Sequence, residues 1–333
     1  MKSTIPVGGS TRRLLAGEAL AAMAQRGSHP SATELPRPEA APDSPMRPGV
    51  PAAAALRGAL AHELASVRGG IAIAADLTRS VGVRLDGLHQ ARRGLKRMQA
   101  LSSLAAESEL PATRWGGQAL RMAKASLADT RQRDALARLL EELCPLKGNP
   151  LTAIEGASSV CALGAAPFGS LGDAVLAVER VAQATRIPAG APLDWHTMAG
   201  AIGQRWKASR KASRSHWLGR GDEWLHGTRK RFQRLADQLT ALREFVDGPM
   251  RRSCKRLVEA AEQLGRARDL GLLAEAVDRS TPEGKALARR ALSLRSQAIR
   301  RARSLSRSAL ARSDDAVVRV VQCRAGITKS RVR

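Results

Sequence analysis

The sequence has few of the residues that usually fill β-sheets. It contains no tyrosine, three phenylalanines and five tryptophans, so aromatic residues make up only 2% of its 333 positions. Alanine, leucine and arginine, which favour helices, are abundant, whereas the β-branched and aromatic residues typical of strands are sparse. Because 44% of the residues are hydrophobic, the chain can form a sizeable core. We therefore predict an all-α fold.

Cysteine and long apolar runs are also scarce. The four cysteines, Cys144, Cys161, Cys254 and Cys323, lie far apart and form no Cys-x-x-Cys pair. This spacing predicts neither a zinc site nor a disulfide framework, and we expect buried free thiols. No run of 18 uncharged apolar residues is present, so we expect no membrane span and a cytoplasmic location.

Acidic residues are greatly outnumbered by basic ones. Asp and Glu total 30 against 55 Lys and Arg, which gives a formal net charge of +25. An excess of this size predicts a polyanionic partner, and nucleic acid, an anionic membrane or an inorganic polyanion would each satisfy it. The excess is rich in arginine, whose planar guanidinium suits bidentate contacts to phosphate oxygens.

Proline and glycine divide the chain into segments. Closely spaced prolines in residues 1–51 predict a disordered arm, and Gly and Pro interrupt a connector at 144–170. Residues 314–333 are interpreted as a basic tail. Helical periodicity predicts helices at 52–77 (with Gly69-Gly70 as a weak point), 114–143, 171–185, 195–218, 249–277 and 283–312, and around the two stretches described next.

Two stretches combine a histidine with basic residues at helical spacing, each after an aspartate (Asp86 or Asp222) that is placed to cap its helix. At about 100° per residue, one face of the first helix is cationic and the opposite face apolar. The cationic face carries His89, Arg92, Arg93, Lys96 and Arg97, and the apolar face Leu88, Ala91, Leu95 and Met98. In the second helix, His226, Arg229, Lys230 and Arg234 oppose Leu225, Phe232, Leu235 and Leu239.

Asp and Glu are almost absent from both cationic faces. Like charges at i,i+4 destabilise a helix by about 0.2–0.5 kcal/mol per pair, so such a stripe is unfavourable unless an anion offsets it. A single offset of 137 residues superposes the two stretches, placing His89 on His226, Arg92 on Arg229 and Arg97 on Arg234. The offset predicts an internal duplication.

These residues resemble a known family. The pattern His-x-x-Arg-basic, followed about 40 residues later by Leu-Gly-x-x-Arg-Asp, is similar to the CHAD family (conserved histidine α-helical domain). Residues 264–269 (LGRARD) match the later motif, whereas its first copy is degraded to LADTRQ at 127–132. Gln233 departs from the pattern, because a basic residue is expected there.

The resemblance implies a CHAD-like domain over residues 52–313. It implies two pseudo-symmetric antiparallel helical bundles, at 52–185 and 190–313, around a basic central groove. It also implies binding of inorganic polyphosphate and association with polyphosphate granules. By position, the binding residues are His89, Arg92, Arg93, Lys96, Arg97, His226, Arg229, Lys230 and Arg234. A secondary set of basic residues on other predicted helices is Arg131, Lys207, Arg210, Lys211, Arg214, Arg268, Arg300, Arg303 and Arg307.

Catalysis finds little support in the sequence. There is no Gly-x-x-x-x-Gly-Lys-Ser/Thr loop and no acidic cluster for Mg²⁺, so we expect a binding protein without a cofactor or metal. The main alternative is a nucleic-acid or nucleoid-binding protein, although no helix-turn-helix or zinc finger is visible. A polyphosphate-processing enzyme is a further alternative. Trp195, Trp206, Trp217 and Trp224 are expected to pack in the core rather than stack on bases.

Overall fold

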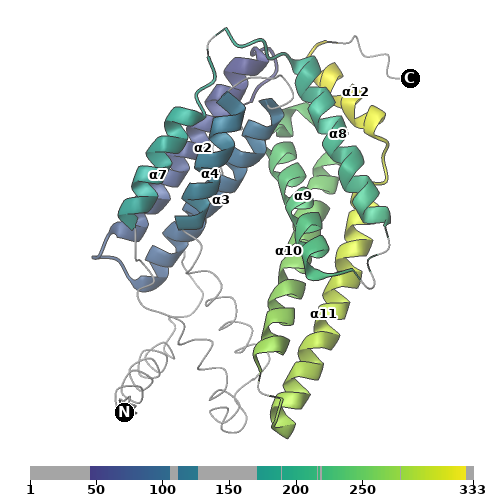
Figure 1. Ribbon diagram of the computed structural model, residues 1–333. Coiled ribbons are helices and arrows are strands. Elements are labelled where there is room, and N and C mark those ends of the chain that lie inside the picture. Colours follow the sequence, from purple (N-terminus) through teal and green to yellow (C-terminus); the bar gives the residue numbers. More distant parts are fainter. Residues whose placement is uncertain are drawn as a thin grey trace, which may run out of the picture.

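The computed structural model describes residues 46–105, 112–126, 171–188, 190–215, 217, 220–277 and 279–327. Within these ranges the chain forms nine α-helices and one 3-10 turn and contains no strand, which confirms the all-α prediction (Figure 1). The predicted arm up to residue 45, the connector at 144–170 and residues 328–333 lie outside the described residues. None of the described helices is both long and apolar enough to cross a membrane.

The first four described helices pack as one group, here called the N-terminal group. They are α2 (Ala52–Ala75), α3 (Val81–Ala105), α4 (Ala112–Ser126) and α7 (Leu171–Ala184). α2 contacts α3 and α7, and α4 contacts the same two helices. Leu56, Val67 and Leu104 are almost completely buried between them. The group therefore has a continuous apolar interior.

Glycines let α2 and α3 approach closely. An added Cβ at Gly70 would lie 2.6 Å from the carbonyl oxygen of Gly87 and 2.7 Å from the nitrogen of Ala91. The sequence pattern predicted a weak point at Gly69-Gly70, but α2 runs through both residues without interruption. Gly70 serves instead to bring two helix backbones together.

The remaining helices form the C-terminal group. They are α8 (Trp195–Arg214), α9 (Asp222–Ala241), α10 (Gly248–Ala276), α11 (Pro282–Ala309) and α12 (Asp314–Arg324), with the 3-10 turn η3 at Arg243–Phe245. α10 lies along α9 and α11, and α8 contacts α9, α11 and α12. Side chains at the N-caps of α8, α10, α11 and α12 accept backbone hydrogen bonds, which fixes where these helices begin.

Helix starts at the two histidine-bearing helices differ from the prediction. α3 begins at Val81, so Asp86 lies inside the helix rather than at its cap. α9 begins at Asp222 itself, with Gly221 in the cap position, and the Asp222 carboxylate pairs with Arg295 on α11. Helix α12, which packs on α8, falls within residues for which the sequence pattern indicated only a basic tail.

Tryptophans pack in the interior, as predicted. Trp206 and Trp217 are 0% and 2% exposed. Trp195 lies against Phe245 with ring centroids 4.2 Å apart, and Trp217 lies 5.7 Å from Trp224. These rings hold helices of the C-terminal group together, which leaves none of the four as an exposed stacking platform.

The two groups meet where α3 contacts α8 and α9. Gln238 on α9 is fully buried and donates from Nε2 to the carbonyl oxygen of Ala100 at 2.9 Å and to Ser103 Oγ at 3.0 Å. Arg205 on α8 donates to the carbonyl oxygen of Ser103 at 3.0 Å. From this junction the two groups diverge like the arms of an inverted V (Figure 1).

Candidate anion-binding site

Helix α3 has the two faces that its sequence predicts. Leu88, Ala91, Leu95 and Met98 are 4% exposed or less and belong to the core. On the opposite side, Arg93 is exposed, while His89, Arg92, Lys96 and Arg97 are half-buried. The cationic side chains therefore extend from a helix whose other side is anchored in the N-terminal group.

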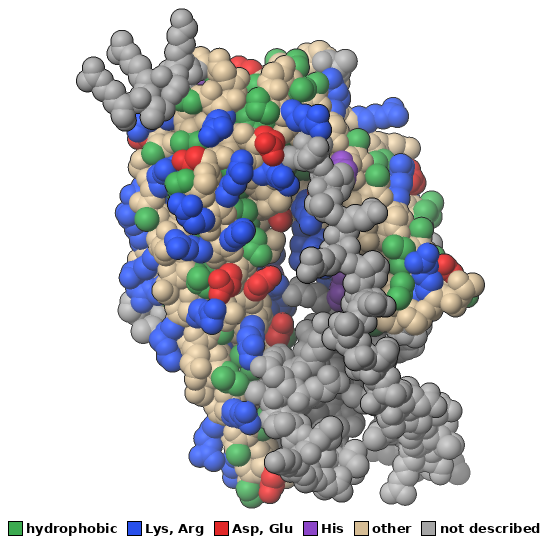
Figure 2. Space-filling model, turned by 180° about the vertical axis from the view of Figure 1, so that it is seen from behind, with side chains coloured by type: hydrophobic (Ala, Val, Ile, Leu, Met, Phe, Trp, Pro, Cys, Tyr) green, Lys and Arg blue, Asp and Glu red, His purple; other side chains and the backbone are tan. Residues whose placement is uncertain are grey.

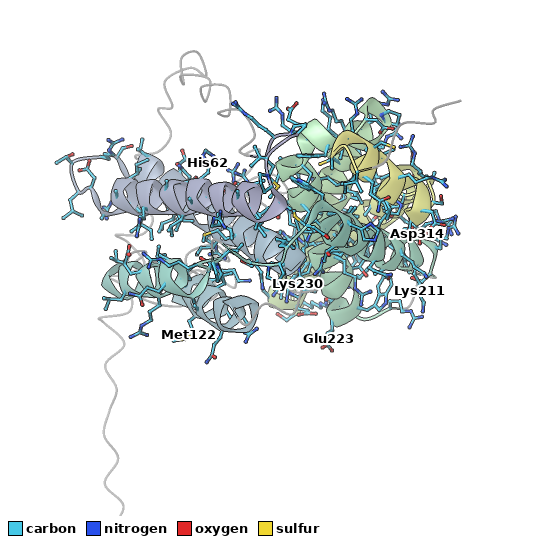
Figure 3. All side chains as sticks on the ribbon, turned by 90° about the horizontal axis from the view of Figure 1, so that it is seen from above. His62, Met122, Lys211, Glu223, Lys230 and Asp314 are labelled. Carbon is cyan, nitrogen blue, oxygen red and sulfur yellow. The ribbon has the colours of Figure 1, made fainter. Side chains whose placement is uncertain are left out.

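Helix α9 is organised in the same way. Leu225, Phe232, Leu235 and Leu239 are 5% exposed or less. Lys230 is exposed, and His226, Arg229 and Arg234 are half-buried. Viewed from above, Lys230 lies near the middle of the molecule, where the two helix groups meet (Figure 3).

Two carboxylates lie where α3 and α9 approach one another. Glu63 on α2, only 9% exposed, pairs with Arg97 at 3.3 Å between Oε1 and Nη1. Asp237 on α9 accepts a hydrogen bond from Gln233 at 3.0 Å. Burial raises the pKa of Asp237 to about 6, although the Gln233 hydrogen bond and the charges of Arg97 and Lys96 favour its ionised form.

A third helix adds basic side chains to this region. Lys124 on α4 donates a hydrogen bond to Gln99 on α3. Burial lowers the pKa of Lys124, and the positive charges of Lys230, Arg234 and Arg121 lower it further. The Lys124 ammonium therefore lies close enough to cations of α4 and α9 for their charges to act on it.

These contacts join basic residues of both helix groups. The charges of Lys96 and Arg97 act on the Asp237 carboxylate. Asp237 follows Arg234 by three residues, so the two lie about one helical turn apart on α9. The cations of α3, α4 and α9 are thus neighbours. We name Lys96, Arg97, Arg121, Lys124, Lys230 and Arg234 the junction cluster. In Figure 2, Lys and Arg side chains are visible in the hollow between the two helix groups.

Two carboxylates lie beside the cationic faces, from which Asp and Glu are almost absent in the sequence. Asp237 continues the polar face of α9 one turn after Arg234, a spacing that the sequence already contains. Glu63 reaches Arg97 from a different helix. No local sequence pattern marks Glu63, or Lys124 and Arg121 on α4, as part of this site. Only tertiary packing brings these three residues to α3 and α9.

The second predicted motif contacts the first through Gly265. The guanidinium of Arg229 packs against this residue on α10, where an added Cβ would lie 3.0 Å from both Cζ and Nη2. Leu264, the preceding residue, is 2% exposed and belongs to the core. The Leu-Gly pair thus anchors α10 and leaves room for an arginine of α9. Its degraded counterpart at 127–132 lies outside the described residues.

Two of the secondary basic residues lie on α8, beside α12 rather than at the junction cluster. Arg210 on α8 pairs with Asp314 on α12 at 3.4 Å. Lys211, also on α8, lies near Asp314 and well away from Lys230 (Figure 3). Arg303 is half-buried, and Arg131 lies outside the described residues. The exposed members are Lys207, Lys211, Arg214, Arg268, Arg300 and Arg307.

Metal-ligating side chains do not converge in the described part of the chain. Within it, no group of three or more His, Cys, Asp or Glu residues could hold a metal ion. Cys254 is a half-buried free thiol whose pKa is raised by burial, and Cys144 and Cys161 lie outside the described ranges. Guanidinium and ammonium groups, together with the carboxylates of Glu63 and Asp237, therefore set the chemistry of the described junction.

Comparison with known proteins adds one finding. No curated protein sequence and no solved structure matches the chain. Residues 53–278, more than half of the chain, match the model of the CHAD domain, and this range includes α3, α9 and α10. The chain therefore belongs to the CHAD family.

Proposed function

We propose that the chain binds inorganic polyphosphate without cleaving it. Membership of the CHAD family supports polyphosphate as the ligand class. The observation that carries the proposal is the junction cluster, in which Lys230 and Arg234 of α9 act on Lys124 of α4 while Lys96 and Arg97 of α3 act on Asp237. In this proposal His89, Arg92, Arg93, His226 and Arg229 extend the cluster along α3 and α9.

The chemistry of the ligand matches that of the cluster. Inorganic polyphosphate is a linear chain of charged phosphates without bases, so a track of cations is sufficient to bind it. Arginine contributes bidentate hydrogen bonds and lysine a mobile point charge. Burial lowers the pKa of Lys124, and the repulsion by neighbouring cations that lowers this pKa further is relieved when an anion enters. Binding would also release counterions, so that affinity falls as salt rises.

We infer a pseudo-two-fold relation between the helix groups, with a groove whose two sides are equivalent. In a pseudo-two-fold arrangement, equivalent residues meet at the axis. By the 137-residue offset, Gln238 is equivalent to Leu101. Gln238 hydrogen-bonds to Ala100 and Ser103, which flank Leu101. We therefore propose that α3 and α9 are symmetry partners that contact one polyphosphate chain from opposite sides, and that the bound protein associates with polyphosphate granules.

Titration of the full chain with long-chain polyphosphate, duplex DNA and single-stranded DNA at equal phosphate concentration tests this function. We expect polyphosphate to bind most tightly and to displace both DNA forms. Tighter binding of DNA, or binding without mutual competition, would instead indicate a nucleic-acid protein. Incubation of the complex with Mg²⁺ or Mn²⁺ is expected to release no phosphate, and release would point to a processing enzyme.

A charge-reversal variant with a matched control locates the site. Replacing three exposed residues, Arg93→Glu, Arg121→Glu and Lys230→Glu, should weaken polyphosphate binding by at least about tenfold. The control carries the same charge change on exposed residues elsewhere, namely Arg180→Glu, Arg251→Glu and Lys255→Glu. Circular dichroism checks that both variants keep their helicity. Equal losses in the two variants would overturn the placement at α3, α4 and α9.

A further inference from the structure

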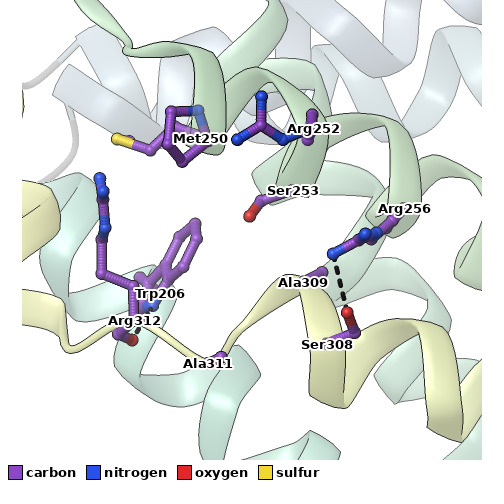
Figure 4. A pocket seen from close by; sticks show the side chains of 10 residues that line it. Trp206, Met250, Arg252, Ser253, Arg256, Ser308, Ala309, Ala311 and Arg312 are labelled. Carbon is purple, nitrogen blue, oxygen red and sulfur yellow. Dashed lines mark hydrogen bonds between the residues drawn. The ribbon is translucent and has the colours of Figure 1, made fainter.

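A second cationic site lies within the C-terminal group, in a pocket of about 200 Å³. Its walls come from the start of α10, the end of α11, the segment before α12, and Trp206 on α8. The volume is several times the roughly 30 Å³ share of one water molecule in the liquid, so the pocket can hold a small solute. Figure 4 shows the lining side chains around the open centre.

Half of the lining is apolar, and three of these residues form a deeply buried wall. Trp206, Met250 and Ala309 are 0–1% exposed. The Trp206 indole donates from Nε1 to the carbonyl oxygen of Arg312 at 3.0 Å, which fixes the ring as a rigid wall. Apolar walls lower the local dielectric and so strengthen the attraction between a bound anion and nearby cations.

The other half of the lining is cationic and hydroxylic. Arg252, Arg256 and Arg312 border the pocket together with Ser253 and Ser308. Arg256 donates from Nη1 to Ser308 Oγ at 2.7 Å, which orients both groups at the rim (Figure 4). Among the described residues, no hydrogen bond or ion pair engages the guanidinium of Arg252, which is exposed. This arginine therefore has its full donor capacity available to a ligand.

One acidic residue partly offsets these charges. Asp247, the N-cap of α10, pairs through Oδ2 with Arg312 Nη1 at 2.7 Å and accepts a hydrogen bond from the Met250 nitrogen. Asp247 is not itself part of the lining. The pair positions Arg312, while Arg252 and Arg256 keep the pocket positive.

The pocket is separate from the junction cluster. Cys254 marks the side of α10 that faces α9, because its thiol donates to the carbonyl oxygen of Ala236 at 3.4 Å. Arg252 and Arg256 are each two residues from Cys254, or about 200° around the helix, and so lie on the side of α10 away from α9. Residues 308–312 also fall beyond the matched CHAD segment, which ends at residue 278.

We propose that this pocket is a distinct anion site that binds a terminal, dianionic phosphate group. Three guanidiniums and two hydroxyls supply donors for its oxygens, and the apolar wall excludes water behind it. The group could belong to free orthophosphate or pyrophosphate, or to the end of a longer phosphate chain. The proposal does not rest on the function of the junction cluster, because neither site shares a residue with the other.

Calorimetric titration of the full chain with orthophosphate and with pyrophosphate tests the pocket. We expect saturable binding that Arg252→Ala/Arg256→Ala weakens by about tenfold or more, since two charge-assisted donors are lost. The matched control, Arg251→Ala/Lys255→Ala, removes the same charge from exposed residues of the same helix that do not line the pocket. Its affinity should stay within about twofold of the parent. Ser253→Asp, which adds a carboxylate to the lining, should also weaken binding.

Further arms separate this site from the junction cluster and identify the source of the phosphate. The variant Arg93→Glu/Lys230→Glu should retain orthophosphate binding, even if it no longer binds long chains. Long-chain polyphosphate with amine-capped ends should bind the Arg252→Ala/Arg256→Ala variant as it binds the parent. If uncapped chains bind the parent more tightly than Arg252→Ala/Arg256→Ala, and capped chains bind both equally, the pocket holds chain ends. Equal losses in the pocket variant and its matched control, or no saturation up to about 10 mM orthophosphate, would overturn the proposal.

Discussion

The guanidinium of Arg229 on α9 packs against Gly265 on α10. An added Cβ at Gly265 would lie 3.0 Å from the Arg229 Cζ, closer than side chains normally pack. The contact links the histidine-bearing motif of α9 to the Leu-Gly motif of α10, which lie far apart in sequence. Glycine in the middle of a helix is unfavourable by roughly 1 kcal/mol relative to alanine, so its place here follows from the space that Arg229 occupies.

Gly265→Ala should therefore separate stability from binding. The gain in helix propensity offsets the displacement of a flexible guanidinium, so we expect the free energy of unfolding to stay constant or rise by up to about 1 kcal/mol. Polyphosphate affinity should fall by about two- to fivefold, because Arg229 leaves its position. Urea denaturation and calorimetry measure the two effects. In an Arg229→Ala background the same change should leave affinity unaltered.

A second glycine of α10 provides the matched control for this experiment. At Gly271 an added Cβ would lie 3.4 Å from Nε of Arg295, which is ordinary packing distance. Gly271→Ala should raise stability in the same way without changing polyphosphate affinity. A fall in affinity with Gly271→Ala would show that helix rigidity, rather than the position of Arg229, controls binding.

Asp237 should make stability depend on pH. Its pKa is about 6 in the folded chain, above its ordinary value of 3.8, so the folded state binds the proton more tightly than the unfolded state. The resulting stabilisation is complete below pH 3.8 and is lost as pH rises through about 6, a change of roughly 3 kcal/mol. Asp237→Asn should abolish this loss in urea denaturation series between pH 4 and pH 7.

The difference in pH-dependent stability between the parent and Asp237→Asn gives the contribution of Asp237 alone. Glu63, His89 and His226 are present in both proteins, so their contributions cancel in this comparison. The exposed Glu223→Gln serves as the control and should follow the parent curve. Because a neutral Asp237 no longer opposes an incoming anion, polyphosphate affinity of the parent should also rise below pH 6, and that of Asp237→Asn should rise less. Parallel stability curves for parent and Asp237→Asn would contradict the assignment.

Gln238 is expected to hold α3 and α9 in register. Replacing it with leucine removes two hydrogen bonds across the junction and should lower the free energy of unfolding by roughly 1–2 kcal/mol. The Gln238 Oε1 is buried without a hydrogen-bond partner among the described residues. Because leucine removes this unpaired oxygen, the loss of stability stays at the lower end of the range for a buried amide. Urea denaturation measures the change. The exposed Gln204→Leu on α8 is the control, and an equal loss there would exclude a specific role for Gln238.

Local periodicity was sufficient to predict the faces of α3 and α9. Leu95 and Phe232 are fully buried and Arg93 and Lys230 are exposed, because an amphipathic helix has to turn its apolar side to the core whatever it packs against. The all-α class followed from composition, because helix-forming residues are abundant and strand-forming residues are sparse. Asp237 could have been included, since it continues the spacing of Arg234 along α9.

Tertiary contacts account for what the sequence could not predict. Glu63 and Lys124 join the junction only because α2 and α4 pack on α3, and no spacing in the sequence relates them to Arg97 or Lys230. Gly70 shows the same limit: its residue type suggests a break in the helix, while its contact with Gly87 explains why the helix continues. The Arg256–Ser308 contact joins two helices that the sequence pattern did not place together.

The salt dependence of polyphosphate affinity should show which cations contact phosphate. Each contact releases counterions, so the slope of log affinity against log salt should fall by about 1 when one contact is removed. Arg93→Gln and Lys230→Gln remove exposed charges from α3 and α9, and each should reduce the slope for polyphosphate by this amount, with an additive effect when combined. Lys255→Gln, on the exposed side of α10, should leave the slope unchanged. If one α3 and one α9 variant reduce the slope equally, both helices contact the same chain, whereas a slope that responds to only one of them would restrict binding to a single helix group.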